Sequence, residues 1–210
     1  MPTTREQHVI YTRNELNSYQ YYIDVLKTLT NENITTYMDI GANVGEFYNV
    51  LSEKLPTITQ SYLIEPEQGN FNFMCDNVKD ENVISLNYGI GYNLRNPRLI
   101  TSSNVGGHSI SESDVSDVDS ELVIKTLEEL NLPLVDLVKM DIEGGELNIL
   151  ANSSYIQEVK WLEIEFHQTP QQSIDGFVPN YIKKYLPNHS VIVYDHNPLN
   201  LYGRCLLKLN

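Results

Sequence analysis

YMDIGANVGEF, at Tyr37–Phe47, is the stretch that decides the fold of this chain. An apolar run is followed by a turn containing Gly41, Asn43 and Gly45, and a helical pattern starts directly afterwards. Glycine readily takes a positive φ and lets a ligand approach the backbone, and asparagine tolerates the left-handed region better than most residues. The pattern therefore predicts a buried strand, a tight turn and a helix, the arrangement that binds phosphates or nucleotides in doubly wound α/β folds.

Length and charge narrow the class of protein. With 210 residues the chain is predicted to form one domain, in which residues 1–33 are a helical cover and residues 34–210 are an α/β core ending in a hairpin. Basic residues number 14 and acidic residues 28, and a net charge of −14 would repel nucleic acid. No signal sequence and no long apolar run is visible, so we expect a soluble, cytoplasmic protein without a membrane partner.

Strand and helix patterns alternate along the chain. Strands are predicted at 34–40, 60–65, 82–89, within 134–140 and at 159–166, and helices at 14–30, 44–55, 67–78, from 146 and around 181–185. Short strands are expected within 99–110, a solvated acidic loop at 112–121 and a hairpin at 189–209. This order predicts an α/β sandwich with a mainly parallel sheet and one antiparallel strand near its end.

Acidic residues recur where the predicted strands end. Glu65 and Pro66 follow the second strand, and in dinucleotide folds an acid about 20 positions past the glycine turn bonds the ribose hydroxyls. Asp141 and Glu143 follow the fourth strand, where open α/β sheets bind their ligands. Nearby Glu146 starts a helix, and an acid in a first helical turn is ordinary dipole chemistry.

Four motifs together resemble the FkbM family of class I S-adenosylmethionine-dependent methyltransferases. They are DIGANVG at 39–45, IEP at 64–66, KMDIEGGE at 139–146 and EIEFH at 163–167. Gly145 stands where the family usually has alanine. The resemblance implies a Rossmann-like, seven-stranded sheet of order 3-2-1-4-5-7-6 with helices on both faces. It also implies methyl transfer to a hydroxyl of a sugar, nucleotide sugar or glycan, as in polysaccharide modification.

The same resemblance implies a donor site at the carboxyl ends of strands one, two and four. Asp39 would face the methionine end of S-adenosylmethionine, and Glu65 would hold its ribose hydroxyls. An acidic pocket suits the sulfonium and ammonium groups of this cofactor. The expected cofactor-binding residues are Asp39, Gly41, Ala42, Asn43, Gly45, Glu65, Pro66 and Asp141.

Catalysis requires a group that takes the proton of the acceptor hydroxyl. His167 is the first candidate, because an unperturbed histidine has a pKa near neutrality, and Asp141 is the next. Glu165 could orient the base. The acceptor, a saccharide or other small molecule, is expected near Glu143, His108 and Ser109. A magnesium ion at Asp141, Glu143 and Glu165 is a mechanistic alternative that we do not favour.

Two functions of other classes share parts of this pattern. An NAD-dependent oxidoreductase has the same strand, glycine turn and distal acid, but Asp39, Asn43 and the acids after the fourth strand argue against it. A catalytically inactive methyltransferase fold that serves as a binding subunit is the other alternative. Binding of S-adenosylmethionine rather than NAD would separate the three.

Overall fold

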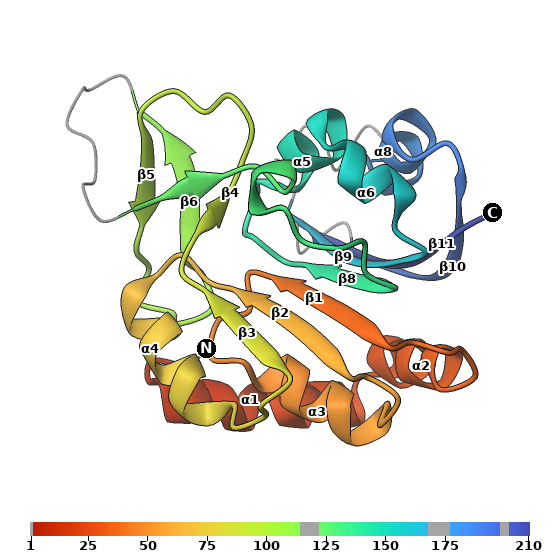
Figure 1. Ribbon diagram of the computed structural model, residues 1–210, viewed down its shortest axis with the longest axis horizontal. Helices are drawn as coiled ribbons and strands as arrows, with labels where there is room; N and C mark the ends of the chain where they lie inside the picture. The colour runs from red at the N-terminus through yellow and green to blue at the C-terminus, as the bar shows by residue number, and fades with distance from the viewer. Residues whose placement is uncertain (1, 114–121, 168–176, 198–201) are drawn as a thin grey trace.

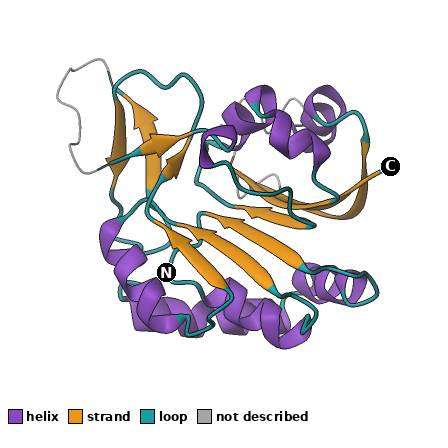
Figure 2. Ribbon diagram, viewed as in Figure 1, coloured by secondary structure: helices purple, strands orange, loops and turns teal. Residues whose placement is uncertain are grey.

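A computed structural model of the protein describes residues 2–113, 122–167, 177–197 and 202–210. A seven-stranded sheet lies between two layers of helices (Figures 1 and 2). Its strands, in spatial order, are β10 (His189–Asn197), β11 (Tyr202–Leu209), β9 (Trp161–His167), β8 (Leu137–Met140), β1 (Thr36–Ile40), β2 (Gln60–Ile64) and β3 (Val83–Leu86). When these seven strands are renumbered in chain order and read from β3 to β10, the order is 3-2-1-4-5-7-6, which confirms the predicted topology.

The parallel register brings the strand ends that carry the predicted site to one edge. Ile40 of β1 lies opposite Ile64 of β2 and Met140 of β8. Glu65 directly follows β2 and Asp141 directly follows β8, so both residues lie beside the turn that follows β1. β11 pairs antiparallel with both β9 and β10, so it is the one antiparallel strand of the sheet, as predicted.

Each face of the sheet is covered by its own helices and apolar core. On one face lie α1 (Arg5–Ser18), α2 (Gln20–Leu29), α3 (Glu46–Lys54) and α4 (Gln68–Asn77); on the other lie α5 (Glu146–Asn152), α6 (Ser154–Glu158) and α8 (Phe177–Tyr185) (Figure 1). Alternation along β1 sends Tyr37 into the first core and Met38 and Ile40 into the second.

The N-terminal region differs from the single helix predicted at 14–30. It forms two helices, α1 and α2, separated at Tyr19, whose backbone is extended with φ −81° and ψ 125°. The prediction relied on apolar spacing, and that spacing begins only at Leu16, the one buried residue of α1. α1 escaped detection because its residues are mostly polar.

The segment between β3 and β8 forms short strands, as expected. They are β4 (Gly89–Ile90) with β7 (Ile124–Lys125), and β5 (Pro97–Ile100) with β6 (Ser109–Glu112), followed by the 3-10 helix η1 (Glu128–Leu130). Most of the predicted acidic loop lies outside the described residues. Among the helices that are described, none is long and apolar enough to cross a bilayer.

Candidate active site

A pocket opens at the carboxyl edge of the sheet, between the turn after β1, the ends of β2, β8, β9 and β11, and helix α1. Nine of the predicted site residues line it: Gly41, Ala42, Asn43, Glu65, Pro66, His108, Asp141, Glu143 and Glu165. The four predicted residues that do not line it are Asp39, Gly45, Ser109 and His167. The sequence thus located the pocket and most of its floor.

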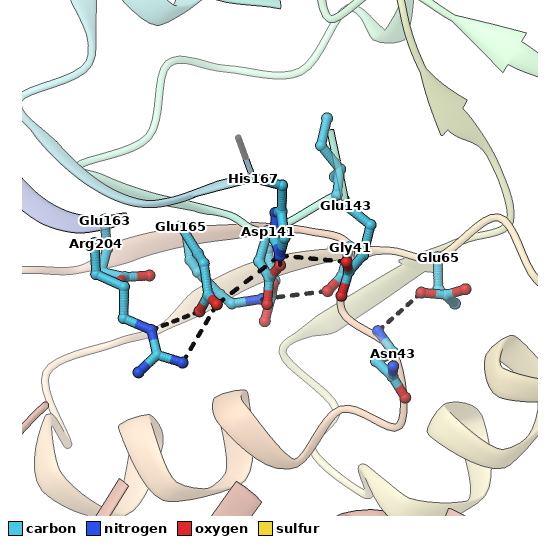
Figure 3. Close-up of polar contacts among 12 residues, drawn as sticks. Gly41, Asn43, Glu65, Asp141, Glu143, Glu163, Glu165, His167 and Arg204 are labelled. Atoms are coloured by element: carbon cyan, nitrogen blue, oxygen red, sulfur yellow. Dashed lines mark hydrogen bonds and ion pairs between the residues drawn. The ribbon is translucent and has the colours of Figure 1, made fainter. Parts of the chain in front are cut away.

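The turn after β1 is fastened to the end of β2 through Glu65. Asn43, in the left-handed region at φ 51°, donates its backbone N–H to Glu65 Oε2 over 2.9 Å (Figure 3). The backbone N–H of Glu67 donates to Oε1 over 2.8 Å. Glu65 is 4% exposed, and its burial raises the pKa of the carboxyl to about 7, although both backbone hydrogen bonds lower it. A carboxylate is therefore held in a fixed position at one end of the pocket.

Packing within the protein requires glycine at both positions of the turn. Gly41 has φ +83°, and a Cβ at this position would lie 2.0 Å from the backbone oxygen of Asp141. At Gly45, with φ +77°, a Cβ would lie 2.6 Å from Cγ2 of Val78. Gly41 therefore lets the turn lie directly against the end of β8, and Gly45 lets α3 begin against the end of α4.

Asp39 lies beneath the turn and does not face the pocket, contrary to the prediction. It is fully buried, accepts a hydrogen bond from the Tyr37 hydroxyl over 2.9 Å and pairs with Lys139 Nζ at 3.1 Å. Burial raises the pKa of Asp39, while Lys139 lowers it. Lys139 also donates to the backbone oxygen of Gly41 over 3.2 Å. The pair therefore supports the turn from below, a tertiary role that spacing in the sequence could not reveal.

His167 lies among carboxylates (Figure 3). Its Nδ1 is 3.1 Å from Glu146 Oε1, and its Nε2 is 3.3 Å from Glu143 Oε2 and 3.9 Å from Asp141 and from Glu165. Burial lowers the pKa of His167, but the hydrogen bond to Glu146 and the surrounding negative charges raise it to about 10. The ring is thus an imidazolium at neutral pH. This differs from the near-neutral pKa on which the choice of His167 as the base relied, and its catalytic role stays a prediction.

Glu165 is engaged by a cation that the sequence analysis did not consider. Arg204 of β11 contacts both carboxylate oxygens of Glu165, through Nε at 2.6 Å and Nη2 at 3.3 Å (Figure 3). Arg204 also contacts Glu15 of α1 at 3.0 Å. The charged group nearest to Glu165 is therefore Arg204 rather than His167, whose Nε2 lies 3.9 Å away, and the role of Glu165 in orienting a base stays a prediction. The signal for Arg204 was an arginine near the start of a largely apolar strand, but its partners come from distant parts of the chain.

Glu143 combines access to the pocket with an altered pKa. Its backbone lies at φ 57°, an uncommon conformation for glutamate, and its side chain is 32% exposed. Burial raises the pKa of Glu143 to about 7, although His167 lowers it. Glu146 is 1% exposed and accepts backbone hydrogen bonds from Ile142 and Gly144, so it fixes the turn that carries Glu143.

A cation could be held by part of this cluster. Among the described residues, ligand atoms of Asp141, Glu143 and His167 lie within 4.8 Å of one another. The predicted magnesium group contained Glu165 in place of His167, and Glu165 is instead paired with Arg204. A metal ion would have to displace the proton of His167.

Comparisons with known proteins agree with the fold described above. A model of the FkbM methyltransferase domain matches residues 39–189, and no curated protein matches. A crystal structure of an FkbM methyltransferase from Methylobacillus flagellatus KT is similar, with 20% identity and a TM-score of 0.55, over 84% of this chain and 44% of that one. The similarity thus spans less than half the length of that protein's chain.

Other similar structures share the fold at low identity. A putative methyltransferase, yhhF from Escherichia coli, is 10% identical with a TM-score of 0.55, over 92% of this chain and 87% of that one. Trm1 from Pyrococcus horikoshii, in complex with S-adenosyl-L-methionine, is 11% identical with a TM-score of 0.54, over 94% and 55%. The sheet order, the pocket and a family match over well more than half of the residues lead to one conclusion: this chain belongs to the FkbM methyltransferase family.

Proposed function

We propose that this protein is an S-adenosylmethionine-dependent O-methyltransferase that acts on a hydroxyl of a sugar or glycan. The observation that carries the proposal is the buried carboxylate of Glu65, which lines the pocket beside the turn after β1 and is held there by two backbone N–H groups. A carboxylate in this position fits the paired hydroxyls of a ribose. When bound, S-adenosylmethionine would supply an electrophilic methyl group, and Asn43 and Glu65 would hold its nucleoside part.

Charges in the pocket favour a neutral acceptor. The two strong cations that line it are both paired, Lys139 with Asp39 and Arg204 with Glu165. Other carboxylates line the pocket as well, including Glu15, Glu65 and Glu143. A diphosphate would meet net negative charge, so we rank a neutral sugar or glycan hydroxyl ahead of a nucleotide sugar.

We assign proton removal to Glu143. It lines the pocket, and with a pKa of about 7 its ionised form is present at neutral pH and is basic enough to assist. The imidazolium of His167, 3.3 Å away, would orient the Glu143 carboxylate and balance its charge. Asp141, which also lines the pocket, is placed to hold the acceptor hydroxyl or the donor.

Replacing Glu65 should weaken donor binding. Glu65→Ala removes a charged hydrogen-bond partner and leaves the N–H groups of Asn43 and Glu67 without their acceptor. Hydrogen bonds to charged groups contribute about 1.5–3 kcal/mol, so we expect the Kd of S-adenosylhomocysteine to rise about 10- to 150-fold. Isothermal titration calorimetry measures it, with circular dichroism to verify that the variant is folded.

Glu81→Ala is the matched control, because Glu81 is an exposed glutamate remote from the pocket. It should bind S-adenosylhomocysteine like the wild type. A thermal-shift titration of the wild type with S-adenosylmethionine, S-adenosylhomocysteine and NAD separates the function classes. A saturating shift with NAD alone would indicate an oxidoreductase, and no shift with any of the three would indicate a binding subunit.

Activity should survive removal of divalent cations. The imidazolium of His167 already supplies positive charge beside Asp141 and Glu143, the two carboxylates of the cluster that could hold a cation. We expect turnover after exhaustive EDTA treatment and gel filtration to match untreated protein within about twofold. Loss of activity that added Mg²⁺ restores, but Na⁺ at equal ionic strength does not, would instead establish the metal-assisted mechanism.

A further inference from the structure

Helix α1 turns a largely polar face toward the pocket. The α1 residues that line it are His8, Tyr11, Thr12, Glu15 and Leu16. Their spacing of three and four is that of one side of a helix. A helix that only covers a core normally buries an apolar stripe, whereas in α1 only Leu16 is buried. The side that would ordinarily be apolar therefore carries an imidazole, two hydroxyl groups and a carboxylate.

Other side chains fix α1 in place. Arg5 donates to Asn70 Oδ1 over 2.9 Å and to Glu67 Oε2 over 3.0 Å, and Arg13 pairs with Glu46 at 2.5 Å. These contacts join α1 to α3 and α4. The anchoring contacts are thus made by Arg5 and Arg13, whereas the His8 and Tyr11 rings, which line the pocket, stack on each other with centroids 6.3 Å apart.

His8 is a neutral imidazole in this face. Burial lowers its pKa, and so do Lys139 and His108, while Asp141 raises it. The ring packs against Gly106, where an added Cβ would lie 2.7 Å from His8 Cε1. Nδ1 is buried without a hydrogen-bond partner. A neutral imidazole can act as donor or acceptor toward a hydroxyl group, depending on its tautomer.

The face runs from His8, near the α1 end where Arg5 contacts Glu67, to Glu15, which lies at the end of the pocket away from Glu65. Glu15 contacts Arg204 of β11 at 3.0 Å, and Arg204 contacts Glu165 of β9. Glu65 follows β2, and β1, β8 and β9 lie between β2 and β11 in the sheet. If the donor nucleoside lies at Glu65, the α1 side toward β9 and β11 remains for the second substrate.

We propose that the face formed by His8, Tyr11, Thr12 and Glu15 is the acceptor subsite, and that it selects a neutral polyhydroxylated ligand over a phosphorylated one. The proposal rests on the proposed function. Tyr11 offers an aromatic surface to the C–H face of a sugar ring, and Thr12 and His8 offer hydrogen bonds. Glu15 accepts from hydroxyl groups and repels phosphate. The face precedes residues 39–189, so it is a property of this chain outside the family match.

The test measures donor and acceptor binding separately. Calorimetry first establishes the Kd of S-adenosylhomocysteine. Saturation-transfer difference NMR on the loaded protein then measures binding of methyl glycosides of glucose, galactose, mannose and rhamnose, with glucose 1-phosphate as the charged counterpart. The test variant is Tyr11→Ala with Thr12→Val. The control is Ile10→Ala with Asn14→Ala, two exposed α1 residues that do not line the pocket.

We expect at least one neutral glycoside to bind, with an affinity that falls at least about tenfold in the test variant and stays unchanged in the control. Binding of S-adenosylhomocysteine should be the same in all three proteins. The subsite is overturned if no glycoside binds, if affinity survives in the test variant, or if glucose 1-phosphate binds equally well. Failure of S-adenosylhomocysteine to bind the wild type would overturn the proposed function itself.

Discussion

Glu143→Gln should lower kcat about 10²- to 10⁴-fold, the usual contribution of a general base. The substitution keeps the size of the side chain and a hydrogen-bond acceptor for His167, but it removes the group that takes the acceptor proton. Glu143 is not among the residues that fasten the turn after β1, so the Kd of S-adenosylhomocysteine should stay within about threefold of the wild type. Initial rates with an acceptor found by mass spectrometry, together with calorimetry, measure the two quantities.

The pH dependence of the rate gives a second check. Glu143 acts as a base only when ionised, and burial places its pKa at about 7, so wild-type kcat should rise with pH through about 7 and level off above it. His167, with a pKa of about 10, stays protonated across that range. The limb near pH 7 should be absent in Glu143→Gln and retained in the control Glu81→Gln. An unchanged limb and rate in Glu143→Gln would move the base to Asp141.

The sequence predicted the parts of the site that depend on local pattern. The strand, the glycine turn and the helix can be recognised from residues Tyr37–Phe47 alone. Parallel strands that are followed by acidic residues bring Glu65, Asp141 and Glu143 to one edge of the sheet, whatever the details of packing. These residues line the pocket as expected. Hydrophobic periodicity and the positions of strand ends are enough to locate residues whose place in the fold depends only on the direction of the strands.

Roles that depend on side chains from distant segments were not predictable. The pKa of His167 is raised by carboxylates after β8 and at the start of α5, and their distances follow only from the folded turn. Arg204 contacts both carboxylate oxygens of Glu165 from 39 positions further along the chain. α1 was missed for a related reason, because a helix that turns a polar face to a pocket lacks the apolar period by which helices are recognised.

Gly41→Ala should have the largest effect on the fold of the site. The new Cβ would lie 2.0 Å from the backbone oxygen of Asp141, and φ +83° is itself strained for alanine. Backbone atoms cannot move aside as a flexible side chain can, so the turn after β1 must separate from the end of β8. We expect the free energy of unfolding to fall by more than about 4 kcal/mol and binding of S-adenosylhomocysteine to be lost. Urea denaturation and calorimetry measure both.

Comparison with Gly144→Ala distinguishes the two effects of Gly41→Ala, the steric clash of the new Cβ and the strain of a positive φ. Gly144 has φ +115°, but a Cβ there would meet nothing within 4 Å. Only the strain remains, for which we expect a loss of about 1–3 kcal/mol with donor binding retained. Equal losses in the two variants would mean that positive φ alone accounts for Gly41. A much larger loss in Gly41→Ala would establish that the turn after β1 needs glycine because the end of β8, with Asp141 on it, must lie against the backbone of the turn.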